Sequence, residues 1–242
     1  MAGKILIYGG SGGIGSEIAK ILNKRGYELH LVGRDEDKMK KIAAEVNANY
    51  TIGDVHENDF FAQVASEAGS PLDGLIYAVG SINLKSLRRA TLDDFMEDLR
   101  VNAVGAALAI QAVLPALNSS SYGASIVLFS SVAALQGFKS HSSIGMAKGA
   151  INGLTISLAT EFSPKIRVNA IAPSLTRTPL AASMIANEQV AETIASMHAI
   201  PRLGNPEDIA KLAAFLVSSD AEWITGQIIS VDGGRSTLRT KG

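Results

Sequence analysis

Hydrophobic residues follow two patterns that alternate along the chain. Short runs of β-branched and other apolar residues are separated by longer stretches in which apolar residues recur every three or four positions. The short runs predict buried strands, and the longer stretches predict helices with one apolar face. The predicted strands cover residues 5–8, 29–32, 50–52, 75–78, 126–129, 167–171 and 228–231.

Strands and helices that alternate in this way are typical of α/β domains, in which helices cover both faces of a parallel sheet. We therefore predict a Rossmann-type, doubly wound parallel sheet of about seven strands. No linker rich in proline or serine divides the chain, and the predicted strands come from both of its ends. Residues 1–242 are accordingly expected to form one domain.

The composition excludes several kinds of partner. Lys and Arg number 22 against 23 Asp and Glu, so the net charge of -1 offers little attraction to nucleic acid or to an anionic membrane. The chain has no cysteine, which removes disulfides and thiolate metal ligands and suits a reducing compartment. The apolar run near the N-terminus is too short for a signal peptide or a membrane span. We expect a cytoplasmic protein without a metal site.

Glycine residues cluster directly after the first predicted strand, where the next helix begins. Glycine lets the backbone approach a pyrophosphate, and a helix N-terminus offers free N–H groups and the positive end of its dipole. The cluster lacks the Gly-Lys-Ser/Thr ending of a nucleoside-triphosphate loop. It therefore predicts a dinucleotide site, formed by Gly9, Ser11, Gly12, Gly13, Ile14 and Gly15.

The glycines fit two spacings, Gly10-x-Gly12-x-x-Gly15 and Gly9-xxx-Gly13-x-Gly15. The second spacing, taken with later segments, resembles the short-chain dehydrogenase/reductases, except that a common threonine is here Tyr8. Each later segment is weakly specific alone, but in this order they cover nearly the whole chain. They are Asp54-Val55, Tyr77-Ala78-Val79-Gly80, Val101-Asn102, Phe129-Ser130-Ser131, Lys148, Arg167-Val168-Asn169-Ala170-Ile171-Ala172-Pro173, Pro206-Glu207-Asp208-Ile209, Ile224-Thr225-Gly226 and Val231-Asp232-Gly233-Gly234.

The resemblance implies that the cofactor is a nicotinamide dinucleotide and that strand ends and a helix hold it. The implied contacts beyond the glycine loop are Arg34, Asp54, Val55, Ala78, Gly80, Lys148, Pro173, Thr176 and Thr178.

The residues after the second predicted strand bear on the choice of dinucleotide. In relatives that prefer NAD an acidic residue there binds the ribose, whereas here the position resembles Gly33, followed by Arg34. A guanidinium suits a 2′-phosphate, so NADP(H) is expected. A register shift of one residue would instead place Asp35 at the ribose and favour NAD(H), and Arg34 could alternatively pair with its acidic neighbours. For Asp54 two roles remain open: a contact to adenine, or the cap of a helix starting near Glu57.

The resemblance also implies an active centre with one member missing. Ser131 corresponds to the serine that polarises the carbonyl, Lys148 to the lysine that binds the nicotinamide ribose, and Asn102 to the asparagine that holds a water for the proton relay. The family's tyrosine, which transfers the proton, should lie four residues before Lys148, and that position is Ile144. An isoleucine cannot transfer a proton.

A substitute for the tyrosine has to come from elsewhere. His141 lies three residues before Ile144 and imidazole is a common acid–base group, although a capping or surface role is the alternative. Ser142 and Ser143 lack an evident activating base and are expected to cap the helix.

The expected function is NADP(H)-dependent oxidoreduction of an unidentified carbonyl or alcohol with an atypical proton donor. The alternative is an NADP(H)-binding sensor or structural subunit with little or no turnover, because a fold does not guarantee chemistry. A nucleotide-sugar or methyl-transfer enzyme is disfavoured by the C-terminal resemblance. Residues 180–197 resemble the family's substrate lid, and their apolar character hints at an apolar small-molecule substrate. By analogy with the family we expect a homo-oligomer, either a tetramer or a dimer, and no nucleic-acid or membrane partner.

Overall fold

The computed structural model describes residues 3–239 except residue 58. One sheet of seven parallel strands runs through the molecule in the order β3-β2-β1-β4-β5-β6-β7. This confirms the predicted doubly wound Rossmann-type sheet, with strand ends within one or two residues of the expected positions. The strands are β1 Lys4–Tyr8, β2 Glu28–Gly33, β3 Asn49–Ile52, β4 Gly74–Tyr77, β5 Ala124–Phe129, β6 Ile166–Pro173 and β7 Ile228–Val231.

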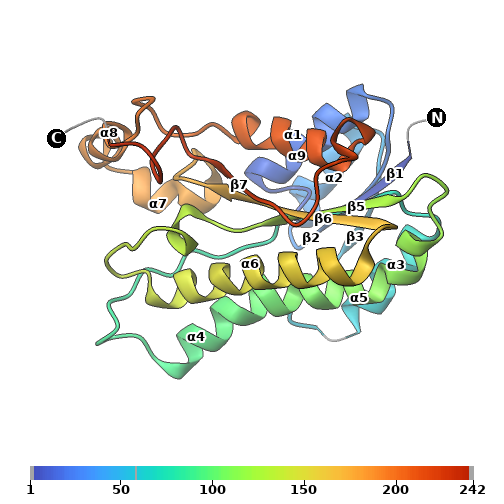
Figure 1. The fold of residues 1–242 in the computed structure, drawn as a ribbon, viewed down its shortest axis with the longest axis horizontal. Helices are drawn as coiled ribbons and strands as arrows, with labels where there is room; N and C mark the ends of the chain where they lie inside the picture. The colour runs from blue at the N-terminus through green and yellow to red at the C-terminus, as the bar shows by residue number, and fades with distance from the viewer. Residues whose placement is uncertain (1–2, 58, 240–242) are drawn as a thin grey trace.

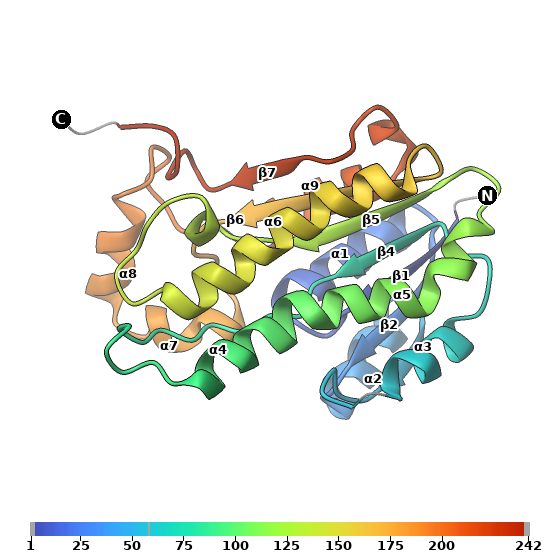
Figure 2. The same cartoon turned by 60° about the horizontal axis from the view of Figure 1, so that its bottom comes forward.

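Helices cover both faces of the sheet (Figures 1 and 2). One face is covered by α1 Gly13–Lys24, α2 Glu36–Glu45 and α9 Pro206–Val217. The other is covered by α3 Phe60–Ala68, α4 Leu92–Leu99, α5 Gly105–Asn118 and α6 Ser142–Phe162. Two short helices, α7 Ala182–Ile185 and α8 Glu188–Ala195, lie beyond the ends of β6 and β7. Short turns complete the chain: η1 Arg100–Val104, η2 Val132–Ala134, η3 Pro179–Ala181 and η4 Ser219–Ala221.

The alternation of side chains along β1 explains why the sheet has two hydrophobic cores. Ile5 and Ile7 pack into the core under α1 and α9, whereas Leu6 and Tyr8 pack into the opposite core with α3 and α5. All four side chains are fully buried. Burial of each of the three aliphatic side chains stabilises the fold by about 1.5–3 kcal/mol relative to exposure. A strand that is covered on both faces therefore has a continuous run of hydrophobic residues in its sequence, as β1 does.

The sheet changes winding direction at β1, which lies between β2 and β4. Chain segments leave β1 and β4 on opposite sides of the sheet, and this opens a crevice at the carboxyl ends of the strands, where α/β proteins bind ligands. Because all strands are parallel, the loops that follow them converge on the same edge. The fold thereby brings together segments from residue 9 to residue 178.

A continuous helix of 27 residues, Leu92–Asn118, spans α4, η1 and α5. It is long and apolar enough to cross a membrane, but half of its most apolar window is buried inside the protein, as in the core helix of a globular domain. The middle segment η1 is a π-helix. The hydroxyl of Tyr77 donates to the carbonyl of Val101 in this turn at 2.8 Å. The hydrophobic pattern of the sequence does not predict this π-turn.

Candidate active site

The glycine loop joins β1 to α1 at the crevice. Gly9 has a φ of 76°, which only glycine adopts at little cost, and a Cβ on Gly15 would overlap the carbonyl oxygen of Gly9. Helix and loop therefore meet at van der Waals distance without intervening side chains. Gly12 is the N-cap of α1 and offers no side-chain cap, so the first N–H groups of the helix are left for a ligand.

The loop after β6 closes the glycine loop from the other side. A Cβ on Gly13 would come within 3.0 Å of the side chain of Thr178, and Thr178 and Pro173 both line a cavity that starts at this contact. A glycine loop that leaves no room for side chains at Gly9 and Gly15, and that ends at a helix N-terminus, fits the pyrophosphate of a dinucleotide. The residues present thus fit a nicotinamide dinucleotide.

A cluster of charged side chains lies at the ends of β2 and β3, and we call it the outer cluster: Arg34, Asp54, His56 and Glu97. The guanidinium of Arg34 is 3.2 Å from Asp54 Oδ2, and the two nitrogens of His56 face Asp54 and Glu97. Hydrogen bonds that the His56 ring donates, first to Asp54 and then to Glu97, raise the pKa of His56 above its usual value. The Arg34 side chain is 73% exposed, so the ion pair leaves it accessible to a ligand.

The outer cluster excludes one of the alternative roles for Asp54 and one for Arg34. Asp54 does not cap a helix, because α3 begins at Phe60 and Asp54 instead accepts a hydrogen bond from the backbone N–H of His56 at 3.0 Å. Arg34 pairs with Asp54 rather than with its acidic neighbours. Gly33 ends β2 as expected, and Asp35 caps α2 through the N–H of Lys38. Val55, next to Asp54, is buried.

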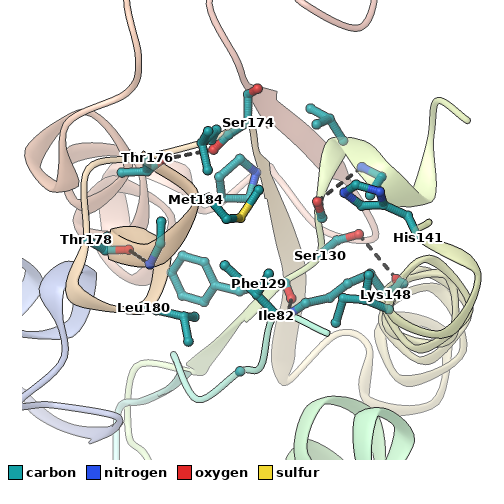
Figure 3. A pocket seen from close by; sticks show the side chains of 18 of the residues that line it. Ile82, Phe129, Ser130, His141, Lys148, Ser174, Thr176, Thr178, Leu180 and Met184 are labelled. Atoms are coloured by element: carbon teal, nitrogen blue, oxygen red, sulfur yellow. Dashed lines mark hydrogen bonds between the residues drawn. The ribbon is translucent and has the colours of Figure 1, made fainter. Parts of the chain in front are cut away.

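A cavity of about 330 Å³ lies at the carboxyl ends of β4, β5 and β6 and is largely apolar (Figure 3). It brings together many of the predicted site residues. His141 and Lys148 lie on one side of the cavity, and Thr176, Thr178 and Leu180 lie opposite. The predicted residues among its lining are Ile14, Ala78, Gly80, Ser131, His141, Lys148, Pro173, Thr176 and Thr178.

Lys148 is buried beneath this cavity. Its ammonium donates to the carbonyl of Phe129 at 2.8 Å (Figure 3). Burial lowers the pKa of Lys148 from 10.5 to about 8, although the nearby charge of Asp98 acts in the opposite direction. A Cβ on Gly80 would lie 3.1 Å from Asn102 Oδ1 and 3.4 Å from Lys148 Nζ, so these three residues are neighbours. The structure thus brings Asn102 and Lys148 together, as predicted.

Ser131 and Ile144 both precede this lysine in the sequence, and both line the cavity. Ser131 follows β5, and its hydroxyl accepts the N–H of Ala133 at 3.1 Å, which leaves the hydroxyl hydrogen available to a ligand. Ile144 lies one turn before Lys148 on α6 and is 5% exposed. An apolar side chain therefore fills the position that the resemblance assigns to a tyrosine.

His141 precedes the first residue of α6 but does not cap the helix with its side chain. Its Nδ1 faces the carbonyl of Lys139 at 2.7 Å, and its ring packs against Phe138 with centroids 5.3 Å apart. The capping role expected for Ser143 is also wrong, because its hydroxyl donates to Asp98 at 2.6 Å and to the carbonyl of Asp94 at 2.9 Å.

Sequence reasoning missed several polar residues of the site. Asp98 is fully buried between α4 and α6, and Ser81 connects it to the cavity. His198 and Ser174 share a hydrogen bond of 2.8 Å, which connects the residue that follows segment 180–197 to the end of β6. Arg235 lines the cavity with its guanidinium 5.4 Å from the ring of Phe138. Among residues 3–57 and 59–239, no group of three or more His, Cys, Asp or Glu is arranged to hold a metal.

The family is established by comparison with known proteins. A family model described as enoyl-(acyl carrier protein) reductase matches residues 9–236. The chain belongs to this family, within the superfamily of short-chain dehydrogenases/reductases. It is therefore a member of an oxidoreductase family that uses nicotinamide cofactors.

Individual relatives cover almost the entire chain. A tropinone reductase homolog of Arabidopsis thaliana is 34% identical over 245 residues, which cover 97% of this chain and 92% of the relative. An inactive 2-(S)-hydroxypropyl-CoM dehydrogenase of Xanthobacter autotrophicus is 32% identical over 231 residues, which cover 91% of this chain and 100% of the relative. The solved structure of ElxO with NADP bound has a TM-score of 0.90 and 29% identity, covering 98% of this chain and 100% of that one.

Proposed function

We propose that this chain is an NADP(H)-dependent oxidoreductase that interconverts a carbonyl and an alcohol, with a proton donor other than the family's tyrosine. The observation that carries the proposal is that Ser131 and Lys148 line one apolar cavity, with Asn102 beside Lys148, next to a helix N-terminus that no side chain caps.

Each residue has a role that its contacts support. The glycine loop and the N-terminus of α1 would hold the pyrophosphate, and Asp54 with Val55 the adenine end. The nicotinamide, when bound, supplies or accepts the hydride. Ser131 would donate a hydrogen bond to the substrate oxygen, which carries growing negative charge during reduction. Lys148 would bind the ribose near the nicotinamide, with Thr176 and Thr178 on the opposite wall of the cavity.

We propose NADP(H) rather than NAD(H) as the cofactor. Arg34 is exposed, lies at the end of β2 and is held in place by Asp54. A guanidinium in this position can form charge-assisted hydrogen bonds to a 2′-phosphate. The relative ElxO has been solved with NADP bound, which agrees with this preference.

The substrate is proposed to be a small molecule with a mainly apolar body. The cavity walls carry Ile82, Leu84, Phe138, Leu180, Met184 and Ile194. Apolar walls favour an apolar ligand through the hydrophobic effect.

We further propose a cytoplasmic homo-oligomer, either a tetramer or a dimer. Met96 on α4 and Met146 and Ile156 on α6 are exposed apolar side chains on two helices that pack together. Exposed apolar patches of this kind mark protein interfaces. Light scattering coupled to gel filtration would measure the mass, and a monomer would contradict the proposal.

A second candidate is a nucleotide-binding protein with little or no turnover. It is favoured by Ile144, which cannot donate a proton, and one relative of similar length is named as inactive. The deciding experiment combines calorimetry of NADPH and NADH binding with NADPH consumption on a panel of ketones and aldehydes. Tight NADPH binding with turnover supports the oxidoreductase. Tight binding without turnover, in a wild-type protein and in a variant with a restored phenol, supports the binding protein.

A further inference from the structure

A buried carboxylate lies on the side of the active centre away from the glycine loop. Asp98, on α4, has no exposed surface. Ser81 Oγ donates to one of its oxygens at 2.7 Å, and Ser143 Oγ to the other at 2.6 Å. A carboxylate is costly to bury unless hydrogen bonds or opposite charge stabilise it. The charge of Asp98 raises the pKa of Lys148, which puts the ammonium within electrostatic reach.

Ser81 links this carboxylate to the cavity. It follows Gly80 in the loop after β4 and lines the cavity, whereas Asp98 and Ser143 do not. The amide of Asn102 donates to Ser81 Oγ at 2.8 Å and to the carbonyl of Asp98 at 2.8 Å. Since Asn102 fixes the serine oxygen from one side, the hydroxyl hydrogen of Ser81 has two remaining directions, toward Asp98 or toward the cavity.

We propose that Asp98 and Ser81 form the proton relay that replaces the missing tyrosine. This inference rests on the proposed oxidoreductase function and identifies the proton donor of the same site. Ser81 is the group that contacts the substrate oxygen, and Asp98 acts through it.

The relay balances protons in both directions. After the carbonyl carbon has received its hydride from the nicotinamide, the O–H bond of Ser81 breaks and its proton goes to the alkoxide oxygen. The carboxylic acid of Asp98 gives its proton to Ser81 Oγ and becomes the carboxylate. The resting protein holds Asp98 as the carboxylate, and solvent in the cavity delivers a proton to it through Ser81 before each reduction. Alcohol oxidation runs the same steps in reverse, with the carboxylate as the base.

The heavy atoms need not move during these steps. With Asp98 ionised, the Ser81 hydrogen points at the carboxylate, which is the arrangement of donors in the structure. With Asp98 protonated, its O–H donates to Ser81 and the serine hydrogen turns to the cavity. Asn102 donates to the same serine oxygen in both states. Asp94, one turn earlier on α4, does not compete because its carboxylate is bound by Lys85 and Asn83.

Four single substitutions and one double variant test the relay in the full-length protein, with NADPH consumption on a carbonyl panel as the first readout. Ser81→Ala and Asp98→Asn should each lower kcat by about 10²–10⁴, the usual contribution of general acid–base catalysis, and the double variant should lose no more than the larger single effect. Ser143→Ala is the matched control, since it removes the other hydroxyl from the same carboxylate. Its loss should stay below about tenfold. Ser81→Thr keeps the hydroxyl and should retain turnover.

Two further readouts separate a relay from a structural role. The pH dependence of kcat that comes from Asp98 should disappear in Asp98→Asn and Ser81→Ala. In Ser143→Ala it should persist but move to higher pH, because the carboxylate loses one hydrogen bond. In the protein without nucleotide, NMR of the Lys148 side chain should find a lower pKa in Asp98→Asn, because the neighbouring negative charge is gone, and an unaltered pKa in Ser143→Ala. NADPH affinity should stay near that of the wild type in all variants.

The remaining outcomes each count against a named part of the proposal. Turnover of Ser81→Ala and Asp98→Asn within about tenfold of wild type overturns the relay, and a hundredfold loss in His141→Ala with Ser81→Ala unaffected would assign the donor to His141. If Ile144→Tyr turns over and the wild type does not, the proposed active centre is supported, but the proposed relay is wrong. If neither turns over while NADPH binds, the oxidoreductase function is wrong and the relay falls with it.

Discussion

Two neighbouring residues of α4 belong to two very different charge clusters. Glu97 belongs to the outer cluster with Arg34, Asp54 and His56, and Asp98 belongs to an inner cluster with Ser81, Asn102, Ser143 and Lys148. The outer side chains are largely exposed, whereas Asp98 is fully buried and Lys148 nearly so. Both clusters flank the same cofactor crevice.

Exposure decides what each cluster can do. Ion pairs in the outer cluster are screened by solvent and are worth at most about 1 kcal/mol each, so Arg34 can leave Asp54 for a ligand phosphate at little cost. In the inner cluster, burial lowers the pKa of Lys148 to about 8, and each polar atom depends on a particular partner. The outer cluster is suited to choosing a ligand, and the inner one to holding and moving protons.

The largest expected effect comes from restoring a phenol to the inner region. Ile144→Tyr places a hydroxyl one turn before the Lys148 ammonium, which lowers the phenol pKa. In the Ser81→Ala background, where the proposed relay is absent, carbonyl reduction should therefore rise by about 10²–10⁴. Ile144→Phe is the control, because it adds the ring without the hydroxyl at a position where overpacking costs about 1–3 kcal/mol. If Phe and Tyr give the same rates, the phenol is not acting as an acid.

In the outer cluster, the effect should be confined to binding. Arg34→Ala should weaken NADPH binding by roughly tens-fold, since one charge-assisted hydrogen bond is worth about 1.5–3 kcal/mol, with little change for NADH. Calorimetry with both nucleotides measures the difference. Equal losses for the two nucleotides, or a wild-type preference for NADH, would contradict the assignment of Arg34 to the 2′-phosphate.

The buried ammonium should cost stability in the absence of nucleotide. A pKa lowered from 10.5 to about 8 corresponds to about 3 kcal/mol of lost stability while both folded and unfolded states are charged. Lys148→Met should therefore raise the free energy of unfolding by about 1–3 kcal/mol near pH 7, after subtraction of the lost hydrogen bond to Phe129. The gain should shrink as the pH rises above about 8 and vanish near 10.5. Urea titrations at several pH values test this, and a pH-independent difference would speak against a charged Lys148.

The smallest effect belongs to His56. Its raised pKa favours the charged form in the folded protein, so its stabilisation is present below the unfolded pKa of about 6.5 and is lost as the pH rises through the folded value. Because the side chain is 40% exposed, solvent screening keeps this below about 1 kcal/mol. His56→Gln should lower the melting temperature slightly at about pH 6 and leave it unchanged at about pH 9. A large loss at both values would mean that His56 acts through packing rather than charge.

The sheet could be predicted from the sequence because buried parallel strands are short, apolar and bounded by glycine or polar residues. Residues 5–8 illustrate this, since both faces of β1 are covered and every side chain is apolar. The glycine loop was also accessible, because backbone geometry constrains it, whereas Asn102 and Lys148, on different helical segments, were assigned to one site only by the family resemblance. The sheet and the glycine loop depend on local patterns.

Asp98 could not be found in this way. In the sequence it follows Asp93, Asp94 and Glu97, which together describe the polar face of a helix. Its burial depends on the packing of α4 against α6 and on the π-turn that follows it, and neither leaves a periodic signal. Ser81 was overlooked for the same reason, since a serine after a glycine in a loop is ordinary until its partner is known.

The π-turn at residues 100–104 has a consequence for how this helix tolerates change. A turn with one additional residue rotates all later side chains about the helix axis by about 100° relative to a regular α-helix. Before the π-turn, α4 directs Asp98 toward the inner cluster. After the turn, the rotated α5 packs Ala106, Ala109 and Val113 against the sheet. The helix should therefore accept many substitutions at its exposed positions but no change in length between Asp98 and Gly105, because a single deletion would rotate one functional face out of alignment with the other.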